Sequence, residues 1–344
     1  MAAAKTSRAG KAKPRGWWLA VPASWLDRAA FRPASLPDDL VTGIALAPAV
    51  IAGLIIFKTP ALEMLMVAVA VGAVAQLAVR WIWRKQSSAA AASPLIASVF
   101  GVALVGPGAG LATSVEIAVL AVVLEVLRAR YMPAIRAQMG LVAFAAVALI
   151  TRGAPNAYVN PANDLAFGDP IATWYQFFSP SSAPIDPIRL YVGNVPGPVF
   201  ATSLLAVAIG IAWLAYARRV SLVVLVMFLA GGLLAIYSFH WDYVFHLDSG
   251  PTWFVAGLLL ADRRLLPESW AVRPPLGFAA GLFAFGLRRS GYGIDAAFYT
   301  VATVQAVMAI LVVALWGAAT GLDRWKRNRR LKQRDANLRV VKSA

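Results

Sequence analysis

The sequence predicts an all-α, polytopic membrane protein with about ten transmembrane helices, and its apolar runs are the first observation behind this fold class. Hydrophobic residues make up 60% of the 344 residues, a larger share than soluble domains carry. A membrane-spanning helix needs about 20 predominantly apolar residues. The runs that we expect to span, some of them short, are 40–57, 61–82, 89–105, 111–127, 138–151, 199–217, 222–239, 253–260, 275–287 and 296–316.

The second observation is where the positive charges fall. Lys and Arg residues are concentrated in both tails and in alternate connections between the apolar runs. The remaining connections contain five of the 32 basic residues: Lys58, Arg152, Arg189, Arg288 and Arg289. Such an asymmetry is the positive-inside pattern of membrane proteins. We therefore expect a multi-pass protein of the bacterial cytoplasmic (inner) membrane, with both termini in the cytoplasm.

The same pattern divides the chain into three parts. Residues 1–38 form a basic cytoplasmic tail, residues 39–317 the transmembrane domain, and residues 318–344 a second basic cytoplasmic tail. Within the domain, residues 152–197 form one long loop that the charge pattern places on the outer side. Because this loop is rich in Pro, Asn, Asp and aromatic residues, we expect it to fold back onto the outer surface and build or cover a site. A structured loop without a ligand is the alternative.

Composition also excludes several classes of function. The net charge of +16 would suit nucleic acid, but the basic residues adjoin apolar spans, so the expected partner is the lipid bilayer and no nucleic acid is expected. The chain has no cysteine and so offers no thiolate ligands for an iron–sulfur cluster. No nucleotide-binding, zinc-protease or serine-hydrolase motif is present. Any redox role would use a flavin, a haem, a quinone or the cluster of a partner.

Two histidines and two aspartates form the most chemically capable group on the outer side. His240 and His246 flank the sequence WDYVF, and Asp242 and Asp248 adjoin them. The histidine spacing does not put both rings on one helix face, so we expect no metal or haem here. Hydrogen bonding at the interface, or a role near a quinone headgroup, suits these residues better. A role in proton transfer is a hypothesis that follows from their titratable side chains.

Carboxylates inside apolar spans are costly and therefore deserve a function or a partner. Glu116 and Glu125 lie in the same predicted helix, about two and a half turns apart, and so point to opposite faces. We expect Glu125 to pair with Arg128 or Arg130. Glu116 is farther from any basic residue and is the better candidate for an ion or proton path.

Several stretches together resemble a known family. They are DDLVTGIALAPAVIAGLIIF, SPLIASVFGVALVGPG, RARYMPAIRAQMGLVAF, GNVPGPVFATSLLAVAIG and DSGPTWFVAGLLLADRRLLP. In order and spacing they are similar to the membrane subunit shared by the Rnf and sodium-pumping Nqr complexes, the RnfD/NqrB family. The chain departs from the family at Met132, where Asn is usual, and at Arg263, where Pro is usual. The resemblance implies a bundle of two related halves that transfers electrons beside other membrane subunits, as part of a membrane oxidoreductase.

The resemblance also implies a flavin. Members of this family bind FMN through its phosphate to a threonine in a Ser-Gly-Ala-Thr type motif of the outer loop. Here the corresponding place reads Ser181-Ser182-Ala183-Pro184, and proline has no hydroxyl to form that bond. We therefore expect a flavin without a covalent bond, or a quinone in its place. The groups that the loop offers for stacking and for phosphate binding are Trp174, Tyr175, Phe177, Phe178, Ser181, Ser182, Gly193 and Asn194.

Two other functions stay open. In lacking the flavin threonine, the chain also resembles UnbU, a branch of this family encoded in enediyne antibiotic clusters. This resemblance implies an accessory role in natural-product biosynthesis. An ion or small-molecule transporter without redox chemistry is the other alternative, because internal repeats and buried carboxylates are usual marks of that class.

Overall fold

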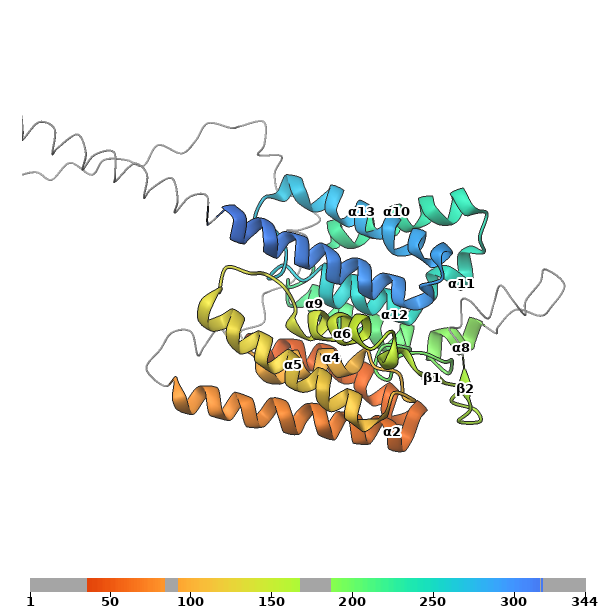
Figure 1. Ribbon diagram of the computed structural model, residues 1–344. Helices are drawn as coiled ribbons and strands as arrows, with labels where there is room; N and C mark the ends of the chain where they lie inside the picture. Colours follow the sequence, from red (N-terminus) through yellow and green to blue (C-terminus); the bar gives the residue numbers. More distant parts are fainter. Residues whose placement is uncertain (1–35, 84–91, 168–186, 316, 318–344) are drawn as a thin grey trace, which may run out of the picture.

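The first half of the chain folds into four helical elements that lie together in Figure 1. The computed structural model describes residues 36–83, 92–167, 187–315 and 317. The helices of this half are α2 (Asp38–Ile82), α4 (Pro94–Ala103), α5 (Gly110–Tyr131) and α6 (Met139–Ile150). Their bounds agree with the apolar runs of the sequence to within a few residues, wherever those runs are described.

Helix α2 contains two of the predicted spans in one continuous element. Lys58 breaks its helical geometry with φ 49° and ψ −117°, and Pro60 follows. Residues near both ends of α2, Asp39 and Arg80, line one cavity, so the chain doubles back at this break. The predicted hairpin is therefore present, and its turn is compressed into a few residues at the site of the break.

The loop after α6 contains short elements that the sequence did not predict. A 3-10 turn, η2 (Ala154–Asn156), precedes the strands β1 (Tyr158–Val159) and β2 (Ala166–Phe167), which pair antiparallel. The prediction of an all-α chain misses this small hairpin, because strands of two residues leave no periodic signal in a sequence. Helix α8 (Pro187–Val192) follows residues 168–186, which lie outside the described part of the chain.

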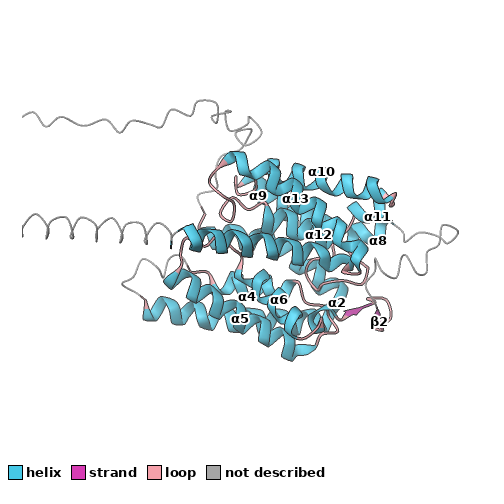
Figure 2. Ribbon diagram, turned by 45° about the horizontal axis from the view of Figure 1, so that its top comes forward, coloured by secondary structure: helices cyan, strands magenta, loops and turns pink. Residues whose placement is uncertain are grey.

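The second half begins with α9 (Leu204–Tyr216), whose N-cap Ser203 accepts a hydrogen bond from the backbone N–H of Ala206. The elements after it are α10 (Leu222–Phe239), α11 (Tyr243–Leu247), α12 (Gly250–Trp253), the π-helix η3 (Phe254–Leu260), η4 (Trp270–Val272), α13 (Arg273–Gly286), η5 (Leu287–Ser290) and η6 (Gly293–Asp295). The last described helix directly follows η6. Together they form the apolar segment Gly293–Leu315, which we call the last helix. Figure 2 shows how completely helices dominate the described chain.

Four helices in the described residues are long and apolar enough to cross a membrane: α2, α5, α10 and Gly293–Leu315. Four shorter apolar helices accompany them: Pro94–Ala103, Met139–Ile150, Leu204–Tyr216 and Gly250–Leu260. The chain is thus a multi-pass membrane protein, but helix length alone does not give the expected number of about ten. Part of the difference arises because α2 contains two of the predicted spans, and because α4 is followed, and α9 preceded, by non-helical backbone, residues 104–109 and 198–203.

The non-helical backbone of the two halves joins at the centre of the protein. The N–H groups of Val199 and Phe200 donate to the carbonyl oxygens of Val105 (2.8 Å) and Ala103 (3.2 Å). All four of these residues are buried. Backbone outside a helix is tolerated at membrane depth only where such bonds satisfy it. The joint therefore lets both helices stop short inside the bundle.

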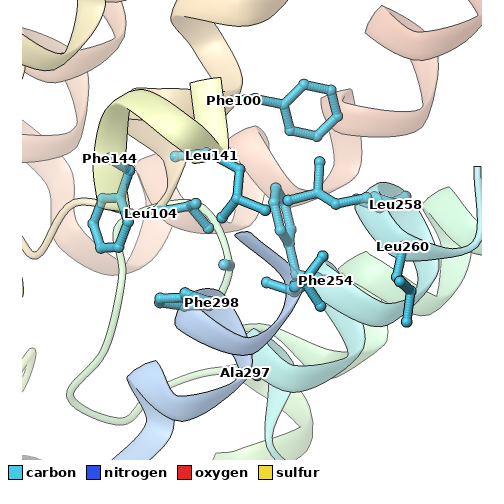
Figure 3. Close-up of a cluster of buried hydrophobic side chains, with 14 of the residues drawn as sticks. Phe100, Leu104, Leu141, Phe144, Phe254, Leu258, Leu260, Ala297 and Phe298 are labelled. Atoms are coloured by element: carbon cyan, nitrogen blue, oxygen red, sulfur yellow. The ribbon is translucent and has the colours of Figure 1, made fainter. Parts of the chain in front are cut away.

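Aromatic side chains fill the space between the halves (Figure 3). Phe100 of α4 meets Phe254 of η3 edge to face, with ring centroids 6.0 Å apart. Phe144 of α6 meets Phe298 of the last helix in the same way at 5.6 Å. Edge-to-face pairs add to the dispersion energy of close packing, which is what holds helices together in lipid.

One glutamine bridges the same halves by hydrogen bonds. The Gln305 side chain is buried, and its Nε2 donates to the carbonyl oxygen of Leu259 at 3.3 Å. Its Oε1 accepts from the backbone N–H of Gln138 at 2.9 Å. Both polar atoms of this amide are therefore satisfied inside the bundle.

Helices α10 and α13 approach closely through glycines. A Cβ atom on Gly281 would lie 1.9 Å from the carbonyl oxygen of Phe228, and one on Gly231 would lie 2.1 Å from that of Phe278. Small residues allow this approach, which is a usual device of membrane helices.

We predict that Gly281→Ala lowers the melting temperature of the protein in detergent, because the added methyl forces α10 and α13 apart. Overpacking of this kind costs about 1–3 kcal/mol. Gly286→Ala on the same helix is the matched control, since a Cβ there meets nothing within 4 Å. Equal melting temperatures for the two variants would show that the close approach does not matter for stability.

Candidate functional site

A cavity of about 960 Å³ opens at the end of the bundle where the basic turns gather. We name this end the basic end, and the end with β1, β2 and η5 the opposite end. The cavity is lined by both ends of α2, the start of α4, the end of α5 and the segments 133–138 and 258–265. Its size falls within the usual range for small-molecule and cofactor sites.

Hydrogen bonds fix the polar side of this cavity. Glu125 is buried and accepts from Arg128 at 2.9 Å and 2.6 Å, and from the backbone N–H of Ser93 at 3.0 Å. The Ser93 hydroxyl donates to Asp39 at 2.5 Å. These bonds tie α2, α4 and α5 together around the cavity. The predicted pairing of Glu125 with Arg128 is thus confirmed.

A second set of bonds holds the other wall. Arg264 donates to Asp262 at 2.7 Å and to the Thr42 hydroxyl at 3.0 Å. Arg136 donates to the carbonyl oxygen of Leu266 at 3.0 Å and to Glu268 at 2.5 Å. The donors and acceptors of this wall come from segments that are far apart in the sequence.

The cavity is lined by charges of both signs, and the adjacent Arg219 also pairs with Asp38 (2.6 Å) and Asp262 (3.5 Å). The basic residues of the lining are Arg80, Arg128, Arg136 and Arg264, and its acidic residues are Asp38, Asp39, Glu125 and Asp262. Apolar and aromatic groups, among them Phe100, Trp83, Ile96 and Leu258, complete the lining. A neutral, planar molecule with polar edges suits such a site better than a highly charged ligand does.

The flavin groups expected from the outer loop are only partly described. Trp174, Tyr175, Phe177, Phe178, Ser181 and Ser182 lie outside the described residues, and so their assignment stays a prediction. Gly193 has φ 90°, and a Cβ on it would lie 2.5 Å from the backbone nitrogen of Ser203, so this glycine permits close packing at the start of α9. Asn194 is exposed.

His246 lies in a buried cluster at the opposite end. Arg288 donates from Nη1 to His246 Nδ1 (3.0 Å) and to the His246 carbonyl oxygen (3.1 Å), and its Nη2 donates to the Thr252 hydroxyl. Trp241 stacks on the imidazole ring at 4.6 Å. Because Nδ1 accepts a bond, the ring proton is on Nε2. Burial and the positive charge of Arg288 lower the pKa of His246 to about 2.

The structure separates the rest of the predicted outer group. Asp242 is exposed, and its carboxylate accepts from the backbone N–H of Phe245 at 2.8 Å, which caps α11. His240 is exposed and ends α10 in a left-handed conformation. Burial raises the pKa of Asp248, and the hydrogen bond from the Tyr191 hydroxyl partly opposes this change. Only His246 among the four is fully enclosed.

Glu116 lies apart from all of these residues. It is exposed on α5, in the first half of the chain, on the same side as the exposed Val115, Val119 and Val123. Its predicted place in an ion or proton path stays a prediction.

Comparison with known proteins identifies the family. A model of the NQR2, RnfD, RnfE family matches residues 39–312, which is most of the chain. The chain belongs to this family. The resemblance read from the sequence is thereby confirmed, and with it a membrane subunit of the kind found in redox complexes. None of the curated proteins matches the chain.

Sequence reasoning did not find the cavity at the basic end of this family member. It assigned Glu125 to an ion pair with Arg128 or Arg130, and Glu125 does pair with Arg128. Asp262 also forms an ion pair, with Arg264. What it lacked was the meeting of five distant segments around them. The only signal was that acidic residues accompany arginines at several of the basic turns.

We predict that acid destabilises the protein through His246. The ordinary pKa of histidine is 6.5 and the folded value is about 2, so below pH 6.5 the unfolded chain takes up a proton that the folded protein does not. Stability present above pH 6.5 is therefore lost as the pH falls, by about 1.4 kcal/mol per pH unit. The measurement is the melting temperature at pH 7.5 and pH 5.

His246→Gln should flatten this dependence, since glutamine keeps an acceptor for Arg288 and does not titrate. His240→Gln is the matched control and should leave the dependence as it is in the wild type. A decline of the same slope in all three proteins would contradict the assignment.

Proposed function

We propose that this protein is an electron-transfer component of a redox complex in the bacterial inner membrane, with both termini in the cytoplasm. It holds a flavin or a quinone without a covalent bond and works with partner subunits. The observation that carries this proposal is the cavity at the basic end, taken together with the family. On this reading the basic end faces the cytoplasm, because positively charged connections are retained there.

The lining of the cavity supports a neutral redox ring. Trp83 and Phe100 supply aromatic surface, and Gln76 and Gln138 bring amides to the cavity. Arg128 is held in the lining by its two hydrogen bonds to Glu125, so its guanidinium keeps a fixed place beside a bound ring. A flavin or quinone supplies the electron-carrying chemistry when bound, and the protein binds and orients it.

Exposed residues on α5 support a partner subunit. Glu116 lies on a face with the exposed apolar residues Val115, Val119 and Val123, inside a helix long enough to span the membrane. A carboxylate that faces hydrocarbon is costly. Coverage of this face by another membrane subunit removes that cost and agrees with a member of a multi-subunit family.

The broken helices favour one second candidate, transport without redox chemistry. Short helices that end at non-helical backbone inside a bundle are a usual feature of transporters. Here, however, buried aromatic pairs such as Phe100–Phe254 occupy the space between the halves. A UnbU-like accessory role in enediyne biosynthesis is a further alternative, based on Pro184 at the place of the flavin threonine.

The first test is the visible spectrum of the protein purified in detergent. We expect flavin absorbance that disappears from the protein band after denaturing electrophoresis, because the proposed flavin is held in the cavity without a covalent bond. Extraction with organic solvent would detect a quinone in its place. Protein with neither molecule bound would contradict the proposal and favour transport.

The second test locates the cofactor. Arg80→Gln removes an exposed charge from the cavity lining and should lower the bound cofactor per protein several-fold, without a change in melting temperature. Arg218→Gln is the matched control, since Arg218 is an exposed arginine in the turn after α9 and does not line the cavity. Equal cofactor content in both variants would place the cofactor elsewhere.

A further inference from the structure

A second cavity, of about 640 Å³, lies at the opposite end of the protein. It is built where the end of α6 and η2 meet β1, β2 and the start of the last helix. The flavin groups expected from the family, as far as they are described, do not line this cavity, and the proposed redox function does not use it. Its lining residues include Arg152, Asn156, Tyr158, Tyr292, Asp295 and Tyr299.

Aromatic rings form one side of this cavity. Tyr292 and Tyr299 meet edge to face with centroids 5.8 Å apart. Tyr292 is 49% exposed, so much of its ring is open to a ligand. Such a pair offers a flat ligand one ring to stack on and the edge of another.

The hydrogen bonds inside the cavity leave donors for a ligand. Asn156 Nδ2 donates to the Tyr299 hydroxyl oxygen at 3.0 Å, and so the proton of that hydroxyl is available to an acceptor. Tyr158 donates to Asp295, and both residues are buried. The one carboxylate of the lining is thus engaged by the protein itself. The Tyr299 hydroxyl is left as a donor, and Asn156 Oδ1 is a buried acceptor without a partner among the described residues.

Arg152 adds a positive charge to these donors. It is exposed, lines the cavity and makes no ion pair or side-chain hydrogen bond within the described residues. Its backbone has φ 54°, which helix α6 reaches as it ends, with the N–H of Gly153 bonded to the carbonyl oxygen of Ala148 at 2.8 Å. The left-handed turn therefore fixes the direction in which the Arg152 side chain leaves the backbone.

We propose that this cavity binds an aromatic carboxylic acid in its anionic form. The ring stacks on Tyr292, and the carboxylate accepts from the Arg152 guanidinium and the Tyr299 hydroxyl. A guanidinium pairs with a carboxylate through two parallel hydrogen bonds, which selects this group over neutral acceptors. The exposed Leu149 beside the cavity gives an apolar ligand an approach from the membrane side.

The test is isothermal titration of the full chain in lipid nanodiscs with 2-naphthoate, with empty nanodiscs subtracted. We expect saturable binding that weakens roughly tenfold or more in Arg152→Gln, because a charge-assisted bond is lost. Tyr292→Leu, at a half-exposed position, should weaken it several-fold. The neutral 2-naphthamide should bind the wild type at least as weakly as naphthoate binds Arg152→Gln.

Arg189→Gln is the matched control, because Arg189 is an exposed arginine of α8 outside this cavity, and binding should be unchanged. Absence of saturable naphthoate binding to the wild type would overturn the proposal. So would equal affinity of the wild type and Arg152→Gln, or binding of flavin mononucleotide here with naphthoate excluded. Loss of naphthoate binding, or its equal affinity for the wild type and Arg152→Gln, leaves the cofactor spectrum described above unaffected, so the two proposals fail separately.

Discussion

The backbone joint between residues 103–105 and 199–200 is the constraint on which the rest of the structure depends. Lipid offers no hydrogen-bond partners, so a helix can end inside a membrane only where other protein groups take up its free N–H and C=O groups. Here each half of the chain satisfies the other at this point. Once the two halves are locked together, α4 and α9 can be short, and the turns around them are placed relative to one another.

Electrostatics then decides what the two ends of the bundle can do. At the basic end, arginines and carboxylates from distant segments neutralise one another around a large cavity, so the site is polar without a strong net field. At the opposite end few cations are present, and one of them, Arg288, is used to hold α11 and α12 together. Arginine therefore has a structural role at the opposite end, in Arg288, and other arginines line a cavity at each end.

Much of the fold could be predicted from the sequence, since apolar runs and charge asymmetry are long signals that average over many residues. The bounds of α6, α10 and α13 fall within a residue or two of the predicted runs. The sequence predicted that Glu125 pairs with Arg128 or Arg130, and the structure shows the pairing with Arg128. The β1–β2 hairpin and the π-helix η3 could not be predicted, because each is decided by tertiary contacts over very few residues.

The candidate sites were harder to predict for a related reason. His246 and the other three residues of the predicted outer group are close in sequence. The structure nevertheless buries His246 and exposes others, because Arg288, which contacts His246, belongs to another element. Each cavity is completed by segments that are far apart in the chain. A single sequence does not show which distant segments contact one another. A local group of polar residues, such as the one that contains His246, was therefore a poor guide to the site.

Gln305 sets a limit on how this architecture can diverge. Its amide is a donor to one half of the protein and an acceptor for the other, and no other uncharged side chain of that length offers both functions. A hydrocarbon replacement would leave the Leu259 carbonyl and the Gln138 N–H without this partner, while glutamate would repel the carbonyl of Leu259. Descendants of this chain are thus free to vary their surfaces, but they can change this position only by re-registering the last helix against α6 and η3.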